Sequence, residues 1–336
     1  MISSASRPRV RSLVLLCSIV IASAALGAAT AQPMPEAAPA PHPPGVIGLP
    51  SGTGPWPAVA EVEASLPTHT IYRPARLPRT RLPIVLWGNG ACRDNGLGNA
   101  RFLREVASHG YLVVAAGRAR REEPMRPAPP PTTQPAAPAG TPGAPGPARG
   151  ADETEASQLL DGLDWAIREN GRRSSPFYRK LDTGSVAAMG HSCGGLQAIA
   201  TAADPRIRTS MIWNSGIYNR GAASGRSGIL LTKDKLREIK GPIAYVNGGP
   251  SDIAYVNALD DFQHIDHVPA LFAWLPVGHG GTFYTAPNGG LYGLVAVAWL
   301  DWQLKRDRRA GAMFVGPRCG LCRDPHWTVQ RKGLDR

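Results

Sequence analysis

The chain has 336 residues and a formal net charge of +12 at neutral pH. This length allows one large domain or two modest ones. The arginines behind the charge are not interleaved with aromatic residues, as they are in nucleic-acid-binding surfaces. The composition therefore predicts a basic, solvated surface and no nucleic-acid partner.

The first 31 residues have the pattern of a secretory signal peptide. Arginines precede an apolar stretch over 13–29, and Ala29-Thr30-Ala31 fits a cleavage site of the A-x-A type. A retained membrane anchor is the alternative, but the stretch is short for a span and rich in Ala and Ser. We therefore expect cleavage after Ala31, a secreted or periplasmic protein, and no stable membrane insertion once the signal is removed.

Two regions rich in Pro, Ala and Gly lack the apolar residues of a core. Residues 32–55 predict a loose leader, after which a folded domain is expected to span 56–310. Within this domain, residues 122–150 predict a disordered insertion, with a substrate lid as the alternative. Residues 311–336 are interpreted as a C-terminal tail that contains a C-x-x-C sequence.

Between these regions, short apolar runs alternate with amphipathic stretches. Apolar runs bounded by Pro or Gly predict buried strands, and apolar residues spaced three or four apart predict helices. Their alternation predicts an α/β fold with a mostly parallel central sheet and helices on both faces. The predicted strands are 59–65, 69–73, 84–87, 111–116, 185–189, 207–213, 243–247 and 270–275. The predicted helices are 97–109, 152–170, 196–203, 233–239, 254–264 and 291–306.

The sequence Gly-His-Ser-Cys-Gly at 190–194 lies directly between a predicted strand and a predicted helix. Strand, sharp glycine turn and helix form the context of a nucleophile elbow. Ser192 is then expected at the turn with its hydroxyl raised above the sheet, and the glycines leave room for the neighbouring backbone. The side chain of His191 is expected to point away from that of the serine.

A serine hydroxyl needs a base within hydrogen-bond reach and a carboxylate that orients the base. Two glycine-rich loops supply such groups just past predicted strands, one with Asp252 and the other with His279. We expect Ser192 to be the nucleophile, His279 the general base and acid, and Asp252 the orienting carboxylate. The alternative acids between the serine and the histidine are Asp260, Asp261 and Asp266.

The same chemistry needs N–H donors for an oxyanion. The N–H of Cys193, the residue after the nucleophile, is expected to be one donor. The loop after the strand 84–87 is expected to supply the other, from Gly90 or, as second choice, from Asn89. No metal or other cofactor is predicted. His264 and His267 lie near acidic residues, but this pattern is equally typical of an ordinary helix end.

With these residues assigned, the chain resembles the α/β-hydrolase superfamily, and within it the exported cutinase-like and polyester-hydrolase-related esterases and lipases. The resemblance covers roughly residues 55–305 and rests on short segments. These segments are 86–90 with 107–114, 189–195, 252–254 and 278–279. It implies an α/β-hydrolase fold and cleavage of small-molecule or polymeric carboxylic esters through an acyl-enzyme. Aromatic residues of the substrate pocket are expected at Trp213, Phe283 and Tyr284, with core packing as the alternative.

The resemblance also bears on the cysteines. In the strand order of the superfamily, the strands before Cys92 and Cys193 are neighbours, which implies that the two sulfurs can meet in a disulfide. Two small buried thiols are the alternative. A disulfide here would stiffen the loop that carries the oxyanion donors. Cys319 and Cys322 can close a small ring, and a single C-x-x-C lacks the second ligand pair of a zinc site.

Three other hypotheses remain open at this point. Peptide-bond cleavage and lactone opening use the same three side chains as ester cleavage. A binding protein that keeps the fold without turnover belongs to a different class. The complete set of nucleophile, base and acid favours an enzyme over such a binding protein.

Overall fold

The computed structural model describes residues 1, 45–130, 135, 152–219, 229 and 231–334. Backbone contacts divide the chain into two units, Met1–Pro41 and His42–Arg336, and every described residue except Met1 belongs to the second. The predicted signal peptide beyond Met1, most of the predicted leader and most of the predicted insertion lie outside the described residues. The predictions made for the parts that are not described stay predictions. The start of the predicted disordered insertion is ordered instead, because Glu123 is buried and pairs with Arg93 and Arg126, and the N–H of Arg126 donates to the carbonyl of Tyr284.

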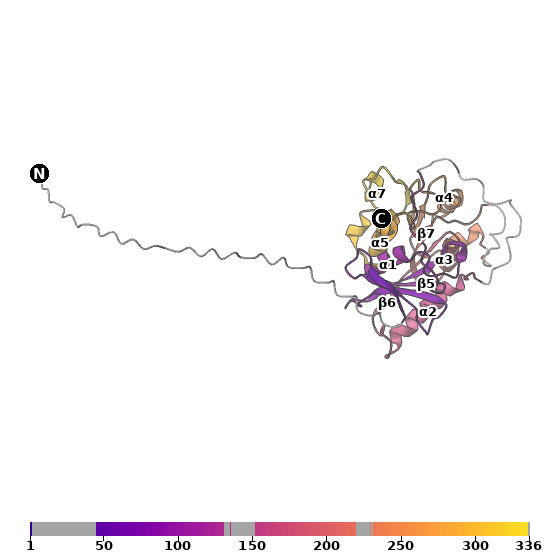
Figure 1. Ribbon diagram of the computed structural model, residues 1–336. Helices are drawn as coiled ribbons and strands as arrows, with labels where there is room; N and C mark the ends of the chain where they lie inside the picture. The colour runs from indigo at the N-terminus through magenta and orange to yellow at the C-terminus, as the bar shows by residue number, and fades with distance from the viewer. Residues whose placement is uncertain (2–44, 131–134, 136–151, 220–228, 230, 335–336) are drawn as a thin grey trace, which may run out of the picture. The chain divides into compact units, whose positions relative to one another are not determined.

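The second unit contains a central sheet with helices around it (Figure 1). The sheet has ten strands in the order β1-β2-β3-β5-β4-β6-β7-β8-β9-β10. From β5 to β9 in this order, neighbouring strands pair in parallel. The strands toward the two edges pair antiparallel. The strands are β1 (Val46–Ser51), β2 (Ala58–Glu61), β3 (His69–Pro74), β4 (Leu82–Gly88), β5 (Leu112–Ala116), β6 (Leu181–His191), β7 (Ile207–Trp213), β8 (Ile243–Asn247), β9 (Ala270–Trp274) and β10 (Thr328–Lys332).

Helices cover both faces of this sheet because the central strands are buried on both sides. In β4, Ile84 and Leu86 pack into one core, and Val85 and Trp87 pack into the other. The first core also holds apolar residues of α2, α3 and α4, and the second holds those of α1 and α5. The helices are α1 (Ala100–Ser108), α2 (Ser157–Gly171), α3 (Cys193–Thr201), α4 (Tyr255–His264), α5 (Gly290–Lys305), α6 (Arg308–Gly311) and α7 (Gly320–Arg323), with 3-10 turns η1 (Gly90–Cys92), η3 (Lys233–Glu238) and η4 (Pro287–Gly289).

The prediction of an α/β fold with a mostly parallel sheet is confirmed. The bounds of β7 and β8 are those predicted, whereas α2 begins at Ser157 instead of 152. Residues before α2 are engaged elsewhere, because Asp152 and Thr154 form backbone hydrogen bonds with the segment that follows β4. The predicted helix 233–239 is a 3-10 turn.

Two predicted boundaries are wrong. Strand β1 lies inside the predicted loose leader and pairs with β2, and the guanidinium of Arg104 donates to the carbonyl of Ile47. Strand β10 lies inside the predicted tail and pairs with β9. Both are edge strands that bury little apolar surface, so their sequences carry a weak signal. The folded unit therefore extends beyond both ends of the predicted range 56–310.

Candidate active site

The serine of the Gly-His-Ser-Cys-Gly sequence lies at a sharp turn between β6 and α3. Ser192 has φ 54° and ψ −121°, a backbone conformation that is rare for a residue other than glycine. The flanking glycines allow this turn to pack. A Cβ atom on Gly190 would lie 2.0 Å from the carbonyl oxygen of Gly194, and one on Gly194 would lie 2.0 Å from the carbonyl group of Gly88. The turn therefore has the geometry expected of a nucleophile elbow.

Three side chains that are far apart in the sequence form one chain of hydrogen bonds. His279 Nδ1 lies 2.6 Å from Asp252 Oδ1, and His279 Nε2 lies 2.9 Å from Ser192 Oγ. Because a carboxylate only accepts, Nδ1 carries the proton of a neutral imidazole and Nε2 accepts from the serine hydroxyl. The structure thus brings together the three residues that the sequence suggested, in the relative order that proton transfer requires.

The carboxylate of Asp252 is buried and fully engaged. Besides His279, Oδ1 accepts from the N–H of Ala254, and Oδ2 accepts from the N–H of Gly248 and from Asn214 Nδ2. Burial acts to raise the pKa of Asp252, but the hydrogen bond and charge of His279 and the backbone N–H donors outweigh it, and the pKa lies below its ordinary value. Asp252 is therefore ionised at neutral pH.

The alternative acids have other partners. Asp261 is buried and binds Lys233, Tyr245 and the N–H of Ile217. Asp260 pairs with Lys233 and His264, and Asp266 pairs with Lys332. Each is thus committed to holding α4 or the strand β10 in place. Asp252 is the carboxylate that contacts His279.

Asn214 is a site residue that the sequence analysis did not recognise as one. It directly follows β7, has φ 46° and is completely buried. Its Nδ2 donates to Asp252 Oδ2 at 2.8 Å and to the carbonyl of Gly278 at 3.0 Å. It therefore joins the acid to the loop that carries the histidine. The available signal was its position, because polar residues at the carboxyl ends of parallel strands commonly line sites.

His191 points away from Ser192, as expected, and contacts the histidine loop. Its Nε2–H donates to the carbonyl of His279 at 2.9 Å, and the two imidazole rings lie 5.4 Å apart. A Cβ atom on Gly90 would lie 2.7 Å from His191 Nδ1, so a side chain at that position would collide with the ring. Burial lowers the pKa of His191 to about 4, and the nearby His279 and Arg93 add to this effect against the opposing charge of Asp252.

We expect His191 to make the protein less stable in acid. Its pKa in the folded state is about 4, whereas the unfolded chain takes up this proton near pH 6.5. Stability should therefore fall as the pH drops from about 6.5 toward 4, by up to about 3 kcal/mol from this group. Denaturant unfolding of the wild type and of H191Q at pH 7.0, 5.5 and 4.0 measures the difference. The exposed His326→Gln is the control, and parallel pH dependences for wild type and H191Q would contradict the prediction.

The predicted oxyanion donors lie around the elbow. Cys193 is the first residue of α3 and directly follows Ser192. Gly90 is the first residue of η1 and follows Gly88, which packs against Gly194 of the elbow. The side chain of Asn89 has a supporting role. Its Oδ1 accepts from the indole N–H of Trp87 at 3.0 Å, and its Nδ2 donates to the carbonyls of Arg93 and Ala116. Asn89 thereby fixes the start of the loop.

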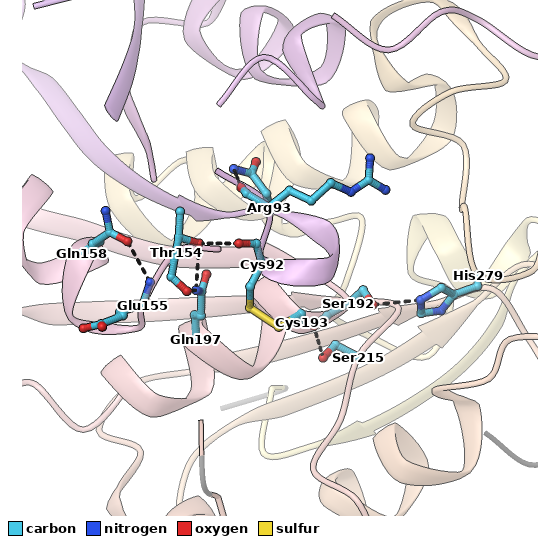
Figure 2. Close-up of a disulfide and its surroundings, with 11 residues drawn as sticks. Cys92, Arg93, Thr154, Glu155, Gln158, Ser192, Cys193, Gln197, Ser215 and His279 are labelled. Atoms are coloured by element: carbon cyan, nitrogen blue, oxygen red, sulfur yellow. Dashed lines mark hydrogen bonds between the residues drawn. A yellow bond between two sulfur atoms is a disulfide. The ribbon is translucent and has the colours of Figure 1, made fainter. Parts of the chain in front are cut away.

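A disulfide joins this loop to the elbow. Cys92 and Cys193 are bonded, with Cα atoms 5.2 Å apart, which confirms the disulfide and excludes two free thiols (Figure 2). A second connection runs beside it: Thr154 donates to the carbonyl of Cys92 through its N–H and its hydroxyl, and Gln197 Nε2 donates to Thr154. Both connections end on α3. Cys319 and Cys322 form the second disulfide.

The expected pocket aromatics divide into two groups. Trp213 and Phe283 are buried and pack with Trp87, Phe102 and Tyr292 beneath the site. The prediction that these two line a substrate pocket is therefore wrong, because their rings fill the core between the sheet and α1. Tyr284 is partly exposed and lines a small hollow that Gly90 also lines. Of the three predicted pocket residues, Tyr284 is therefore the one that lies at the surface.

A larger cavity, of about 240 Å³, lies in a different place and is lined by polar residues that include Thr68, Asp94 and Thr154. The triad does not line it. Among the described residues, no group of three or more His, Cys, Asp or Glu side chains is arranged to hold a metal ion. In the same part of the chain, each helix is too short or too polar to cross a membrane.

Comparison with known proteins gives no family for this chain. No protein-family model matches it, and no curated protein matches it.

Proposed function

We propose that this protein is a serine hydrolase that cleaves carboxylic esters. The observation that carries the proposal is the continuous hydrogen-bond chain from Ser192 through His279 to Asp252, placed where β6, β8 and β9 end. A serine at a strained elbow, a neutral imidazole and a buried carboxylate are the groups that nucleophilic acyl transfer needs. The strand order and the elbow support membership of the α/β-hydrolase superfamily, and the motifs support a cutinase-like esterase.

The proposed reaction has two halves. Ser192 Oγ bonds to the ester carbonyl carbon while His279 Nε2 takes the hydroxyl proton, and the N–H groups of Gly90 and Cys193 stabilise the oxyanion. The carbon–oxygen bond to the alcohol then breaks, and His279 returns the proton to the leaving alcohol. In the second half, water attacks the acyl-enzyme with His279 again as base, which releases the acid and restores Ser192. No cofactor enters either half.

The buried Asp252 supports this assignment through charge. It is ionised beside Nδ1, so it stabilises the imidazolium that forms when the serine proton is transferred. Peptide-bond cleavage and lactone opening would use the same groups and remain alternatives. The two disulfides support an oxidising compartment, and we propose that the protein is exported.

Labelling with a fluorophosphonate tests the proposal. The wild type should form a covalent adduct on Ser192, located by mass spectrometry, because only an activated serine reacts rapidly with this reagent. The S192A variant should not be labelled, whereas a variant of another serine, Ser174→Ala, should be. A panel of p-nitrophenyl esters and peptide amides then separates esterase from peptidase. A folded protein that is neither labelled nor active on esters would support the binding-protein alternative instead.

A further inference from the structure

Most residues that line the hollow next to Gly90 carry hydrogen-bonding groups, and its surface is about equally polar and apolar. Its walls include Gly90, Arg93, Asn95, Asn99, Glu123 and Tyr284. The hydroxyl of Tyr284 lies 3.2 Å from Asn99 Nδ2, which fixes the ring against one wall. These residues offer a polar part of a substrate groups to bind, besides their partners within the protein.

The hollow is next to the proposed reaction centre. Gly90 is a proposed oxyanion donor, and its Cα faces His191, whose ring lies 5.4 Å from that of His279. Tyr284, which also lines the hollow, has its ring 6.4 Å from that of His191. Because Gly90 both lines the hollow and is a proposed oxyanion donor, a substrate bound by Gly90 lies next to the hollow.

Guanidinium groups outnumber carboxylates around Glu123, which lines the hollow. The carboxylate of Glu123 is nearly buried between two guanidinium groups, those of Arg93 at 3.1 Å and Arg126 at 2.9 Å. Arg126 is held in place, because its N–H donates to the carbonyl of Tyr284 and its guanidinium lies 5.6 Å from the centre of that ring. The guanidinium of Arg101 donates to the backbone carbonyl of Glu123 at 2.6 Å, so three positive groups lie around one carboxylate.

Arg93 is the group that can reach a ligand. It directly follows η1, its side chain is 61% exposed, and Glu123 contacts one of its terminal nitrogens. Figure 2 shows its side chain extending from η1 toward the side on which Ser192 and His279 lie. Arg93 lines the hollow together with Gly90 and Tyr284. The planar guanidinium can donate two parallel hydrogen bonds to a carboxylate.

We propose that Arg93 binds a carboxylate carried by the ester substrate, so that the preferred substrates are half-esters of dicarboxylic acids. The two oxygens of a carboxylate match the paired N–H donors of a guanidinium. The inference rests on the proposed hydrolase function and adds the substrate class to it. The same contact would hold the free acid end of a polyester chain that is cleaved from its terminus.

The test compares two substrates that differ in one charge, monoethyl adipate and diethyl adipate. The quantity compared is the ratio of kcat/KM for the monoester to kcat/KM for the diester. This ratio should be about fivefold lower in the R93Q variant than in the wild type, mainly because KM for the monoester rises. High salt should lower the ratio for the wild type because the contact is exposed. Arg237→Gln, an equal charge change on an exposed side chain, is the control. An unchanged ratio in R93Q would overturn the inference.

A binding measurement separates this inference from the proposed function. Calorimetry with monoethyl adipate on S192A and on the S192A/R93Q variant needs no turnover. Binding that weakens about fivefold on loss of Arg93 supports the carboxylate site even if the wild type cleaves neither ester, in which case the hydrolase proposal fails alone. Ester cleavage with binding that does not depend on Arg93 overturns the carboxylate site and leaves the hydrolase proposal standing.

Discussion

Replacing Asp252 with asparagine is expected to lower kcat for ester hydrolysis by about 1,000- to 10,000-fold. The reason lies in the donors around the carboxylate. Oδ2 faces two N–H donors, from Gly248 and Asn214, whereas Oδ1 faces the N–H of Ala254 and the imidazole of His279. In the D252N variant, the amide N–H₂ would meet two N–H donors at the Oδ2 position. At the Oδ1 position it can instead donate to His279, because the imidazole can change its tautomer. The proton then moves to Nε2, which can no longer accept the proton of the serine.

Steady-state kinetics with p-nitrophenyl butyrate measure this loss. The exposed Asp234→Asn is the matched control, since it makes the same change on the surface and should leave kcat as it is. Thermal unfolding shows that the D252N protein is folded. A D252N protein that keeps kcat within tenfold of the wild type would contradict the assigned role of Asp252.

Removing the disulfide between η1 and α3, by the C92A/C193A double substitution, is expected to affect both stability and turnover. The bond closes a loop between residues 101 positions apart, for which the chain-entropy model gives about 4 to 5 kcal/mol of stability. Ala91 and Cys92 both have positive φ, so without the bond η1 can relax to a more common backbone. We expect kcat to fall about tenfold, because the two proposed oxyanion donors lose their fixed separation.

Denaturant unfolding measures the first effect, and kinetics well below the midpoint of unfolding measure the second. The hydrogen bonds through Thr154 and Gln197 should keep the double variant folded. The C319A/C322A variant is the control, because its ring spans three positions and should cost only about 2 kcal/mol, with no change in kcat. A C92A/C193A protein with reduced stability and unchanged kcat would contradict the prediction that the disulfide positions the proposed oxyanion donors.

The sequence predicted the centre of the fold better than its edges, for a physical reason. The parallel strands are buried on both faces, so each is a short apolar run such as β8, which is easily distinguished from its surroundings. Strand β10 is Thr-Val-Gln-Arg-Lys and β1 contains Gly48 and Pro50, and neither shows a clear period. Their pairing depends on the neighbouring strand and not on local sequence.

Some residues of the candidate active site could also be predicted from the sequence, and others could not. Ser192, Asp252 and His279 could be found because each follows a predicted strand and belongs to a residue type with a defined role. Asn214 acts by reaching across two loops, and no sequence pattern specifies such a contact. Trp213 and Phe283 lie at positions that suggested a pocket, but whether an aromatic ring faces solvent or core is decided by how α1 and α5 pack.

The two outermost strands also bear on how the molecule behaves in a crowded solution. An unpaired strand edge can template association with another chain. In β1, Pro50 lacks an N–H and Gly48 has a positive φ, so the ladder of donors is interrupted. In β10, the opposite edge strand, two of the five residues are charged, and Lys332 pairs there with Asp266. Both rims of the described sheet are therefore poor templates for intermolecular β-pairing, which protects the protein from aggregation through its own sheet.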